Sequence, residues 1–120
     1  MTKGPPLETL KNRADFVTLN RKGRKWTAPG MVVQAIPNGQ AALRVGYTVT
    51  KKTESSAVKR NRIKRRLRAA ATAVLAESAM PGHDYVLIGR SLSATRPYES
   101  LCKDLRWCLE KLGCRKGEGQ

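Results

Sequence analysis

Apolar and polar residues alternate most regularly over residues 43–50. The apolar positions are Leu43, Val45, Tyr47 and Val49, and the residues between them are Arg44, Gly46, Thr48 and Thr50. A period of two predicts a β-strand with one buried side and one polar side. Because glycine has no side chain, Gly46 predicts a gap on the polar side where another backbone approaches.

Two further segments have the composition of strands. Residues 31–37 are rich in β-forming residues, and the turn Pro37-Asn38-Gly39-Gln40 predicts a hairpin with the strand that follows it. The run Tyr85-Val86-Leu87-Ile88, within residues 84–90, is continuously apolar. Such a run is typical of a central strand that is covered on both faces.

Residues 57–78 have the spacing of a long helix. At about 100° per residue, Ile63, Leu67, Ala70 and Val74 form one narrow apolar stripe. The polar residues 53–56 precede it and predict its cap. A shorter helix is predicted from Asn12, as its cap, to Lys22, with Gly23 just past its end. A last helix is predicted to begin at Pro97 and to end at Gly113.

The predicted order is helix, two or three strands, helix, strand, helix. This order predicts an α+β fold, with three helices against a single sheet of about four strands. A length of 120 residues suits one domain with one modest core. We therefore predict a single domain over residues 1–120, with loose tails at 1–6 and 113–120.

Charge indicates the class of ligand, because the long helix is also the most basic part of the chain. Seven of the ten residues 59–68 are Lys or Arg and none is acidic. The whole chain has 24 Lys plus Arg against 9 Asp plus Glu, a net charge of +15. Solvated helices usually mix charges of both signs. An unbroken cationic surface beside an apolar stripe instead favours nucleic-acid binding.

The remaining reactive residues do not form a predicted catalytic or metal site. The three cysteines, Cys102, Cys108 and Cys114, are spaced six apart without a CxxC pair, so free thiols are expected. The only histidine, His83, has one neighbouring acid, Asp84, and the other acids are scattered.

No segment indicates a membrane or an export route. No apolar run approaches the ~18 residues of a membrane span, and the first residues lack the apolar centre of a signal peptide. We therefore expect a cytoplasmic protein with no membrane partner and no small-molecule substrate.

Several of these segments together resemble one known family, the bacterial ribonuclease P protein component. Lys59-Arg60-Asn61-Arg62-Ile63-Lys64-Arg65 resembles its Arg-Asn-Arg signature, and Leu43-Arg44-Val45-Gly46 followed by Val49-Thr50-Lys51-Lys52 resembles its central strand. Leu10-Lys11 with Asp15-Phe16 and Gly23 is similar to its first helix, and Asp84-Tyr85-Val86 to its last strand. The similarity spans about residues 7–112.

The resemblance implies a protein subunit of ribonuclease P, the endoribonuclease that removes the 5′ leader from precursor tRNA. In such an enzyme the RNA subunit carries out the chemistry with Mg²⁺ that is held mainly by RNA. The residues implied to bind the catalytic RNA are Arg60, Asn61, Arg62, Lys64, Arg65 and Arg68. The residues implied to bind the single-stranded leader, in a cleft between the first helix and the sheet, are Phe16, Lys51 and Lys52.

The resemblance also carries expectations about the fold and about departures from the family pattern. It implies a fold like domain 2 of ribosomal protein S5, in the order α-β-β-(β)-α-β-α, with a left-handed β-α-β crossover against the usual hand. Aromatic residues are common in the family at the positions of Asn20 and Gln34. Stacking on the leader is therefore expected to be weaker here, or to involve another residue such as Trp26.

Three other functions fit parts of the sequence. A ribosomal protein of similar fold would have the same basic surface, and its partner would be ribosomal RNA. An autonomous nuclease would need His83 or Asp84 for cleavage. A helix on a membrane surface is the least favoured, because the alanine-rich stripe beyond Leu67 has no Trp or Phe.

Overall fold

A five-stranded mixed sheet lies at the centre of the computed structural model, which describes residues 7–10, 13–40 and 42–115. The strands stand in the order β1-β4-β5-β3-β2. Neighbours β1 and β4, and β4 and β5, are parallel, whereas β3 pairs antiparallel with both β5 and β2. The strands are β1 (Leu7–Thr9), β2 (Arg24–Thr27), β3 (Met31–Pro37), β4 (Leu43–Thr48) and β5 (His83–Gly89).

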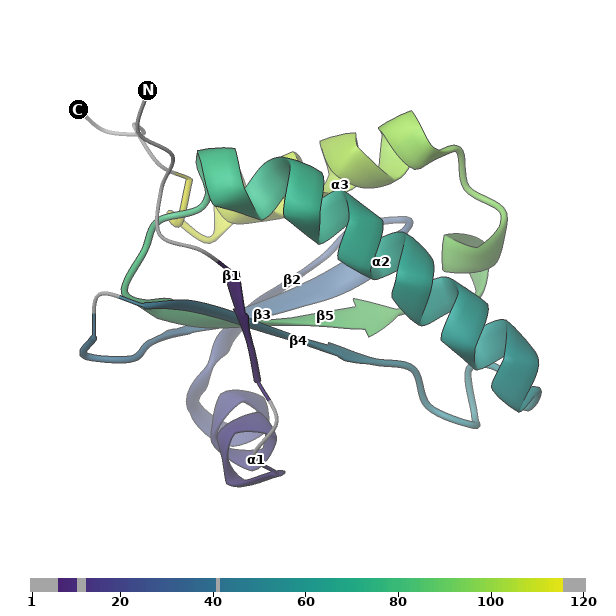
Figure 1. Cartoon of the computed structure of the whole chain (residues 1–120), viewed down its shortest axis with the longest axis horizontal. Helices are drawn as coiled ribbons and strands as arrows, with labels where there is room; N and C mark the ends of the chain where they lie inside the picture. Colours follow the sequence, from purple (N-terminus) through teal and green to yellow (C-terminus); the bar gives the residue numbers. More distant parts are fainter. Residues whose placement is uncertain (1–6, 11–12, 41, 116–120) are drawn as a thin grey trace.

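Three helices cover the two faces of this sheet. Helix α1 (Arg13–Lys22) lies on one face, and α2 (Ala57–Ser78) and α3 (Tyr98–Lys111) lie together on the other (Figure 1). A short 3₁₀ helix, η1 (Ser91–Ala94), connects β5 to α3. The α+β class and all three predicted helices are confirmed. The predicted cap of α1, Asn12, lies outside the described residues.

Two features of the sheet differ from the sequence-based expectation. It has five strands rather than about four, because the short strands β1 and β2 form its two edges. The predicted hairpin between β3 and β4 is wrong, since β5 lies between them and pairs with both. The turn itself is present, with Gly39 at a φ of 70°. The two strands that it connects are not neighbours in the sheet, because β5 lies between them.

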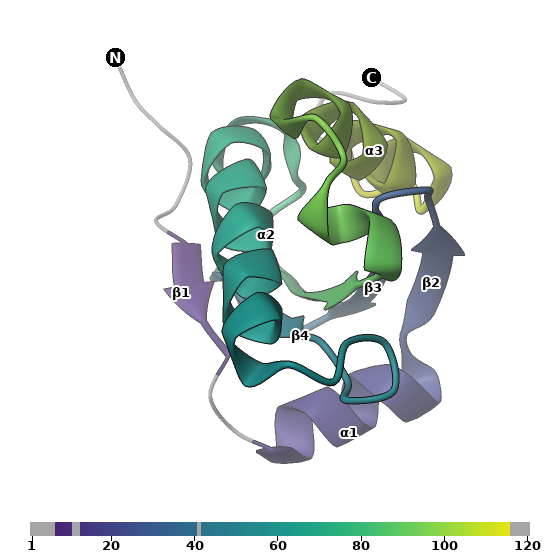
Figure 2. The same ribbon diagram turned by 90° about the vertical axis from the view of Figure 1, so that its right-hand side faces the viewer.

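Helix α2 connects the parallel neighbours β4 and β5. In the view of Figure 2 both strands run toward the reader, β5 lies on the β3 side of β4, and α2 returns above the sheet. A path that turns in this sense is a left-handed β-α-β crossover, the rare hand for such connections. The expectation drawn from the resemblance is confirmed.

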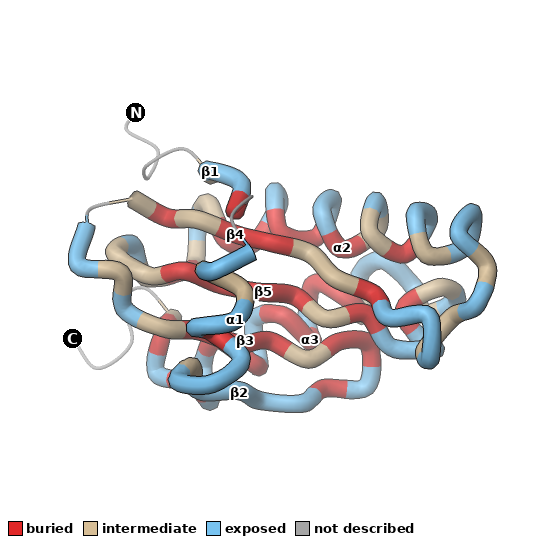
Figure 3. The backbone as a smooth tube through the Cα atoms, turned by 90° about the horizontal axis from the view of Figure 1, so that it is seen from below, coloured by how far each residue is buried: buried red, intermediate tan, exposed pale blue. Residues whose placement is uncertain are grey.

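The main hydrophobic core lies between the sheet and helices α2 and α3. The four residues of the predicted α2 stripe are each at most 1% exposed: Ile63, Leu67, Ala70 and Val74. Figure 3 shows the resulting alternation of buried and exposed segments along the helix. A second, smaller core lies between the sheet and α1, formed by Leu10, Leu19 and Val86 with the partly buried Phe16, Ile36 and Ile88.

The end of the described chain is packed rather than loose. Gly113, with a φ of 72°, follows the C-cap of α3, Leu112, and Arg115 then forms an isolated bridge with Ala79. The prediction of a loose tail is therefore wrong for residues 113–115, while residues 1–6 and 116–120 lie outside the described part. The three cysteines are free and buried, as predicted. Burial, with a smaller contribution from Asp104, raises the pKa of the Cys108 thiol to about 12.

Truncation of Leu67 tests how strongly the buried stripe holds α2. Leu67 is fully buried, so Leu67→Ala should lower the free energy of unfolding by about 3–5 kcal/mol, through lost burial and the cavity left behind. Urea unfolding measures this. The matched control is Val58→Ala on the same helix, where the side chain is 78% exposed and the expected change is within about 0.5 kcal/mol. Equal losses in the two variants would contradict the assigned orientation of α2.

Candidate nucleic-acid interface

The buried stripe of α2 fixes which of its other side chains reach solvent. Ser56 caps the helix, as predicted from the polar segment before it, by accepting a hydrogen bond from the backbone N–H of Lys59. On the side away from the core, Asn61, Arg62, Arg65 and Arg68 are exposed. The first turn contains no acid, so Lys59 and Arg60 lie near the positive end of the helix dipole. The nearest carboxylate is that of Glu54, which precedes the cap and accepts a hydrogen bond from the backbone N–H of Ser56 at 3.0 Å. The exposed cations and the dipole both attract an anion to this end of the helix.

No Lys or Arg side chain of α2 forms an ion pair with a carboxylate in the part of the chain that the structure describes. The four ion pairs found there involve Arg44, with two carboxylates, Arg96 and Arg115. The cations of α2 therefore keep their charge available for a partner outside the chain. We call the surface formed by the exposed Asn61, Arg62, Arg65 and Arg68, together with the partly exposed Lys64, the basic face.

Two arginines of α2 bind backbone oxygens of this chain instead. Arg60 Nη1 donates to the carbonyl oxygens of Glu54 and Ser55, at 2.9 and 2.8 Å. Arg66 Nη2 donates to the carbonyl oxygen of Arg96. Arg60 was among the residues predicted to bind RNA. In the structure, one nitrogen of its guanidinium is engaged by the segment that precedes the helix. Arg68 is held differently, with its guanidinium carbon 5.2 Å from the centroid of the Tyr47 ring.

A groove of about 710 Å³ runs between α1 and the exposed side of the sheet. Phe16, predicted to bind an extended strand, lines it and is half-buried. The lining residues are Arg13, Phe16, Val17 and Asn20 of α1, with Gln34, Thr48, Thr50, Val86 and Ile88 of the sheet side. Lys51 and Lys52 do not line the groove but are exposed in the turn directly after Thr50, at its rim. The structure thus brings the three predicted leader contacts to one region.

The Phe16 ring fills the gap that Gly46 leaves in β4. A Cβ atom at position 46 would lie 2.5 Å from Phe16 Cζ and 2.7 Å from Cε1, so only glycine fits beneath the ring. The prediction that a backbone approaches Gly46 is therefore wrong, because an aromatic side chain occupies that space. This packing fixes the position of Phe16 at the wall of the groove.

Asn20 and Gln34, the two positions where the resemblance implied aromatic residues, face each other in the same groove. Gln34 Nε2 donates to Asn20 Oδ1 at 3.5 Å, which joins β3 to α1. Trp26, the suggested replacement, does not line this groove. Its ring packs edge-on against Trp107 of α3, with the ring centroids 5.7 Å apart. The contact between Asn20 and Gln34 could not be predicted from the sequence, because it depends on how α1 packs on the sheet.

An ion-pair network attaches α1 to the sheet. Arg44 donates through Nε to Asp84 Oδ1 at 2.8 Å and through Nη2 to Asp84 Oδ2 at 2.6 Å. Its Nη1 also lies 3.7 Å from Asp15 Oδ2 of α1, one residue before Phe16. The hydrogen bond to Asp84 is the main cause that raises the pKa of the Arg44 guanidinium. These contacts hold the first turn of α1 over the sheet.

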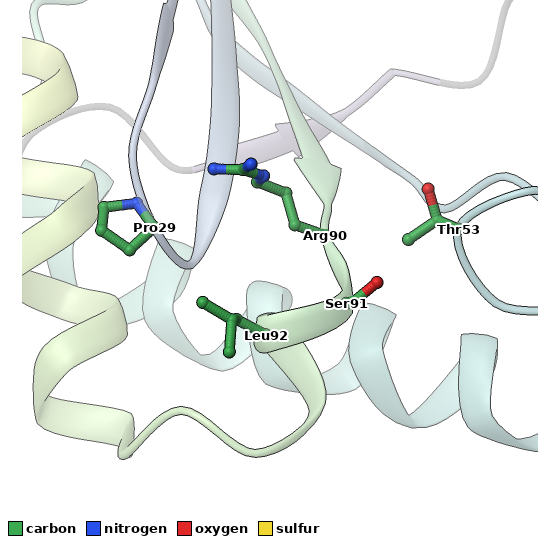
Figure 4. Close-up of a pocket in the computed structure, with 5 residues that line it drawn as sticks. All are labelled: Pro29, Thr53, Arg90, Ser91 and Leu92. Atoms are coloured by element: carbon green, nitrogen blue, oxygen red, sulfur yellow. The ribbon is translucent and has the colours of Figure 1, made fainter.

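A second, smaller pocket lies beyond the end of the groove and contains a cation that the sequence analysis did not single out. The pocket measures about 220 Å³ and is lined by Pro29, Thr53, Arg90, Ser91 and Leu92 (Figure 4). Arg90 follows β5 directly, two residues after Ile88 of the groove, and its side chain is anchored by a 2.7 Å hydrogen bond from Nη1 to the carbonyl oxygen of Ala28. No sequence motif marks Arg90 as part of this region.

The residues that an autonomous nuclease would need are engaged in the fold. The Asp84 carboxylate accepts from Arg44 and from Asn38 Nδ2, at 2.9 Å from the latter, and is buried. His83 Nδ1 lies 3.1 Å from the carbonyl oxygen of Pro81, and its ring stacks on Tyr85. Among the described residues, no three His, Cys, Asp or Glu side chains are placed to hold a metal ion. A search of the described helices finds none with the length and apolarity that crossing a membrane requires.

A cationic helix face and an aromatic-walled groove, carried on the two sides of a small α+β sheet, are features typical of a basic nucleic-acid-binding protein. The family model described as Ribonuclease P matches residues 5–113 of the chain. The chain therefore belongs to the ribonuclease P protein family.

Individual relatives agree with this assignment. The chain is 47% identical over 112 residues to the ribonuclease P protein component of Paramagnetospirillum magneticum, covering 89% of this chain and 84% of that protein. It is 44% identical over 110 residues to that of Gluconacetobacter diazotrophicus, covering 91% and 94%. Among solved structures, the RNase P proteins of Staphylococcus aureus and Thermotoga maritima superpose with TM-scores of 0.70 and 0.68, at 27% and 26% identity. The alignments cover 86% and 88% of this chain, and 93% and 94% of those proteins.

Substitution of Gly46 tests the packing of Phe16 against the sheet. Gly46→Ala should lower the free energy of unfolding by about 1–3 kcal/mol, because the added methyl group must displace the ring. The matched measurement is a double-mutant cycle with Phe16→Ala, followed by urea unfolding. Without the ring the extra methyl group has room, so the two losses should not add. Simple additivity would contradict the contact.

Proposed function

We propose that this chain is the protein subunit of a cytoplasmic ribonuclease P and binds two RNAs at once. Its basic face would bind the catalytic RNA, and the groove would hold the single-stranded 5′ leader of precursor tRNA. Arginine forks match the geometry of phosphate oxygens. Asn61 adds a donor and an acceptor suited to a base edge or a 2′-hydroxyl.

The observation that supports this proposal best is that one short segment connects both sites. Thr50 lines the groove, Lys51 and Lys52 follow at its rim, and the next residues lead to the cap of α2. In Figure 2 this loop lies between α1 and the first turn of α2. An RNA strand that leaves the groove along this loop passes Lys51 and Lys52, then the short segment 53–56 with Glu54, and then reaches the cations of α2. Such a path suits a substrate strand that must enter a site on a second, bound RNA.

The cleavage itself is assigned to the RNA partner and its magnesium. The described residues do not fit a resident Mg²⁺ site, since Asp15, Asp84 and Asp104 each lie beside an arginine rather than in a cluster of oxygen ligands. We therefore derive no chemical step through a protein-bound metal. The role of this chain is to bind and orient the two RNAs.

Removal of cations from the basic face should weaken assembly with ribonuclease P RNA. Arg62→Ala and Arg65→Ala should each lower the affinity and flatten the log–log dependence of binding on salt by about 0.7–0.9 per lost phosphate contact. The wild-type chain should restore cleavage of precursor tRNA by this RNA at low magnesium, and both variants should need more protein to do so.

Lys103→Ala, which removes one exposed cation from α3, is the control and should leave assembly unchanged. Equal effects of all three variants would reduce the proposal to non-specific attraction by net charge. Recovery of ribosomal RNA instead of ribonuclease P RNA in a pull-down would favour the ribosomal alternative. Cleavage by the RNA-free chain that is lost in His83→Ala would favour an autonomous nuclease.

Removal of the Phe16 ring should affect the substrate and spare assembly. Phe16→Ala should weaken binding of precursor tRNA to the assembled enzyme by about five- to hundredfold, the range expected when one stacked base loses its aromatic partner. Binding of mature tRNA, which has no leader, should not change. Equal weakening for the two RNAs would show that the groove is not the leader site.

A further inference from the structure

The two tryptophans of the chain lie against each other on the surface. Trp26 of β2 and Trp107 of α3 are 37% and 40% exposed, and the sequence contains no other tryptophan. Their ring centroids are 5.7 Å apart, and the ring planes cross at 83°. Tryptophan buries most of its surface on average, so two adjacent rings that remain open at the edge of a sheet indicate a binding surface.

The packing of α3 on the sheet does not require these exposed rings. On the core side of the contact, Cys108 of α3 is fully buried, and its Sγ donates to the carbonyl oxygen of Trp26 at 3.7 Å. Val33, which pairs with Trp26 across β3, is also fully buried. These residues already close the junction between β2 and α3 from the inside. The open parts of the two indoles therefore add an aromatic surface that faces solvent.

Cations flank this aromatic surface. Lys111 follows Trp107 by one helical turn, and its Nζ lies 5.9 Å from the centroid of the Trp26 ring. Arg24 is exposed and lies two residues before Trp26, so both side chains leave the same side of β2. We call the surface formed by Arg24, Trp26, Trp107 and Lys111 the tryptophan patch.

The tryptophan patch lies at the edge of the sheet opposite to the basic face. Strand β2 forms one edge of the sheet, and β1, the other edge, lies beside α2. Figure 2 shows β2 below α3 on one side of the molecule, and α2 with β1 on the other. The groove opens on the face that α1 covers, whereas α3 lies on the opposite face. RNAs on the basic face and in the groove therefore leave the patch accessible.

We propose that the tryptophan patch binds an unpaired segment of a further RNA molecule, distinct from the catalytic RNA and from precursor tRNA. Single-stranded RNA presents flat bases and phosphates in turn, and aromatic rings with nearby cations are the groups that bind both. This third RNA contact goes beyond the function proposed above and does not depend on it.

Other occupants match the patch less well. A second copy of the chain would bring a like charge of +15 to a cationic surface. An acidic peptide would match the cations but would leave the two indole faces without flat partners. The acid Glu110, three residues after Trp107, is paired with Arg115 at 3.4 Å. Its charge is thus largely offset, and it does not exclude a polyanion from this side of α3.

Tryptophan fluorescence reports on this patch alone, because both tryptophans of the chain belong to it. The full chain is assembled with ribonuclease P RNA, saturated with precursor tRNA and then titrated with a short oligouridylate. Assembly and precursor tRNA should leave the emission unchanged, because neither proposed site contains a tryptophan. The oligouridylate should then quench the emission, since its bases stack on the indoles.

Substitutions in the patch should weaken this titration in two separable ways. Trp107→Ala should lower the affinity for the oligouridylate by about five- to hundredfold, the range for one lost stacking partner, with Trp26 as the remaining reporter. Trp107→Phe keeps an aromatic ring and should retain most of the affinity. Lys111→Ala should flatten the log–log dependence of binding on salt by about 0.7, the value for one phosphate contact on a single strand.

Lys22→Ala is the matched control for the charge change. It removes an exposed cation at the end of α1, outside the patch, and should keep the wild-type salt dependence. Because Lys111 is exposed, its truncation should leave the urea unfolding midpoint unchanged, so this variant tests the patch independently of any effect of ring removal on folding.

Several results would overturn the proposal. An oligouridylate that does not quench the assembled enzyme, or that binds Trp107→Ala and the wild type equally, would show that the patch is not an RNA site. Quenching by ribonuclease P RNA or by precursor tRNA would assign the patch to one of those molecules instead. Tighter binding of an oligoglutamate than of the oligouridylate would assign it to an acidic protein. All of these results leave the basic face and the groove to their own tests.

Discussion

The burial of one apolar stripe is the interaction on which the arrangement of α2 depends. Seven cations in ten residues repel one another, and none of them forms an ion pair with a carboxylate among the described residues. Burying a valine, leucine or isoleucine side chain contributes about 1.5–3 kcal/mol, and Ile63, Leu67 and Val74 of the stripe are almost completely buried. This gain holds the helix on the sheet despite its charge. It also fixes the rotation of the helix, so that the cations share a common outward direction.

The sheet divides the molecule into two faces with different tasks. Helices α2 and α3 close one face and form most of the core, whereas α1 covers only part of the other and leaves the groove. The position of α1 is set by Arg44, which reaches from β4 to carboxylates of both α1 and β5. Asp15 is the carboxylate of α1, and the ring of the next residue, Phe16, packs on Gly46 of β4. The groove and the basic face are therefore connected through the sheet and through the segment from Thr50 to Ser56.

Local patterns in the sequence were sufficient to predict features that lie within a single helix or strand. The stripe of α2 and the alternation of β4 follow from spacing, a cap within residues 53–56 follows from their polarity, and the family resemblance added the left-handed crossover. The strands β1 and β2 were not predicted because three or four largely exposed residues carry no periodic signal. The hairpin was wrongly predicted because a turn motif does not show that a distant strand will be inserted beside it. Likewise, the contacts of Arg60 with the preceding turn and of Gln34 with Asn20 depend on how elements pack, which spacing does not contain.

The central position of β5 also has a consequence for the order in which the protein takes shape. Strands β3 and β4 are made early in synthesis, but each needs β5 as its neighbour, and β5 begins only at His83. The ribosome must therefore release most of the chain, including the whole cationic helix, before the sheet can close. Pairing between segments so distant in sequence is intrinsically slow. During that interval the basic segment is already free of the ribosome but not yet held on its core, so nearby polyanions meet it as an unfolded chain.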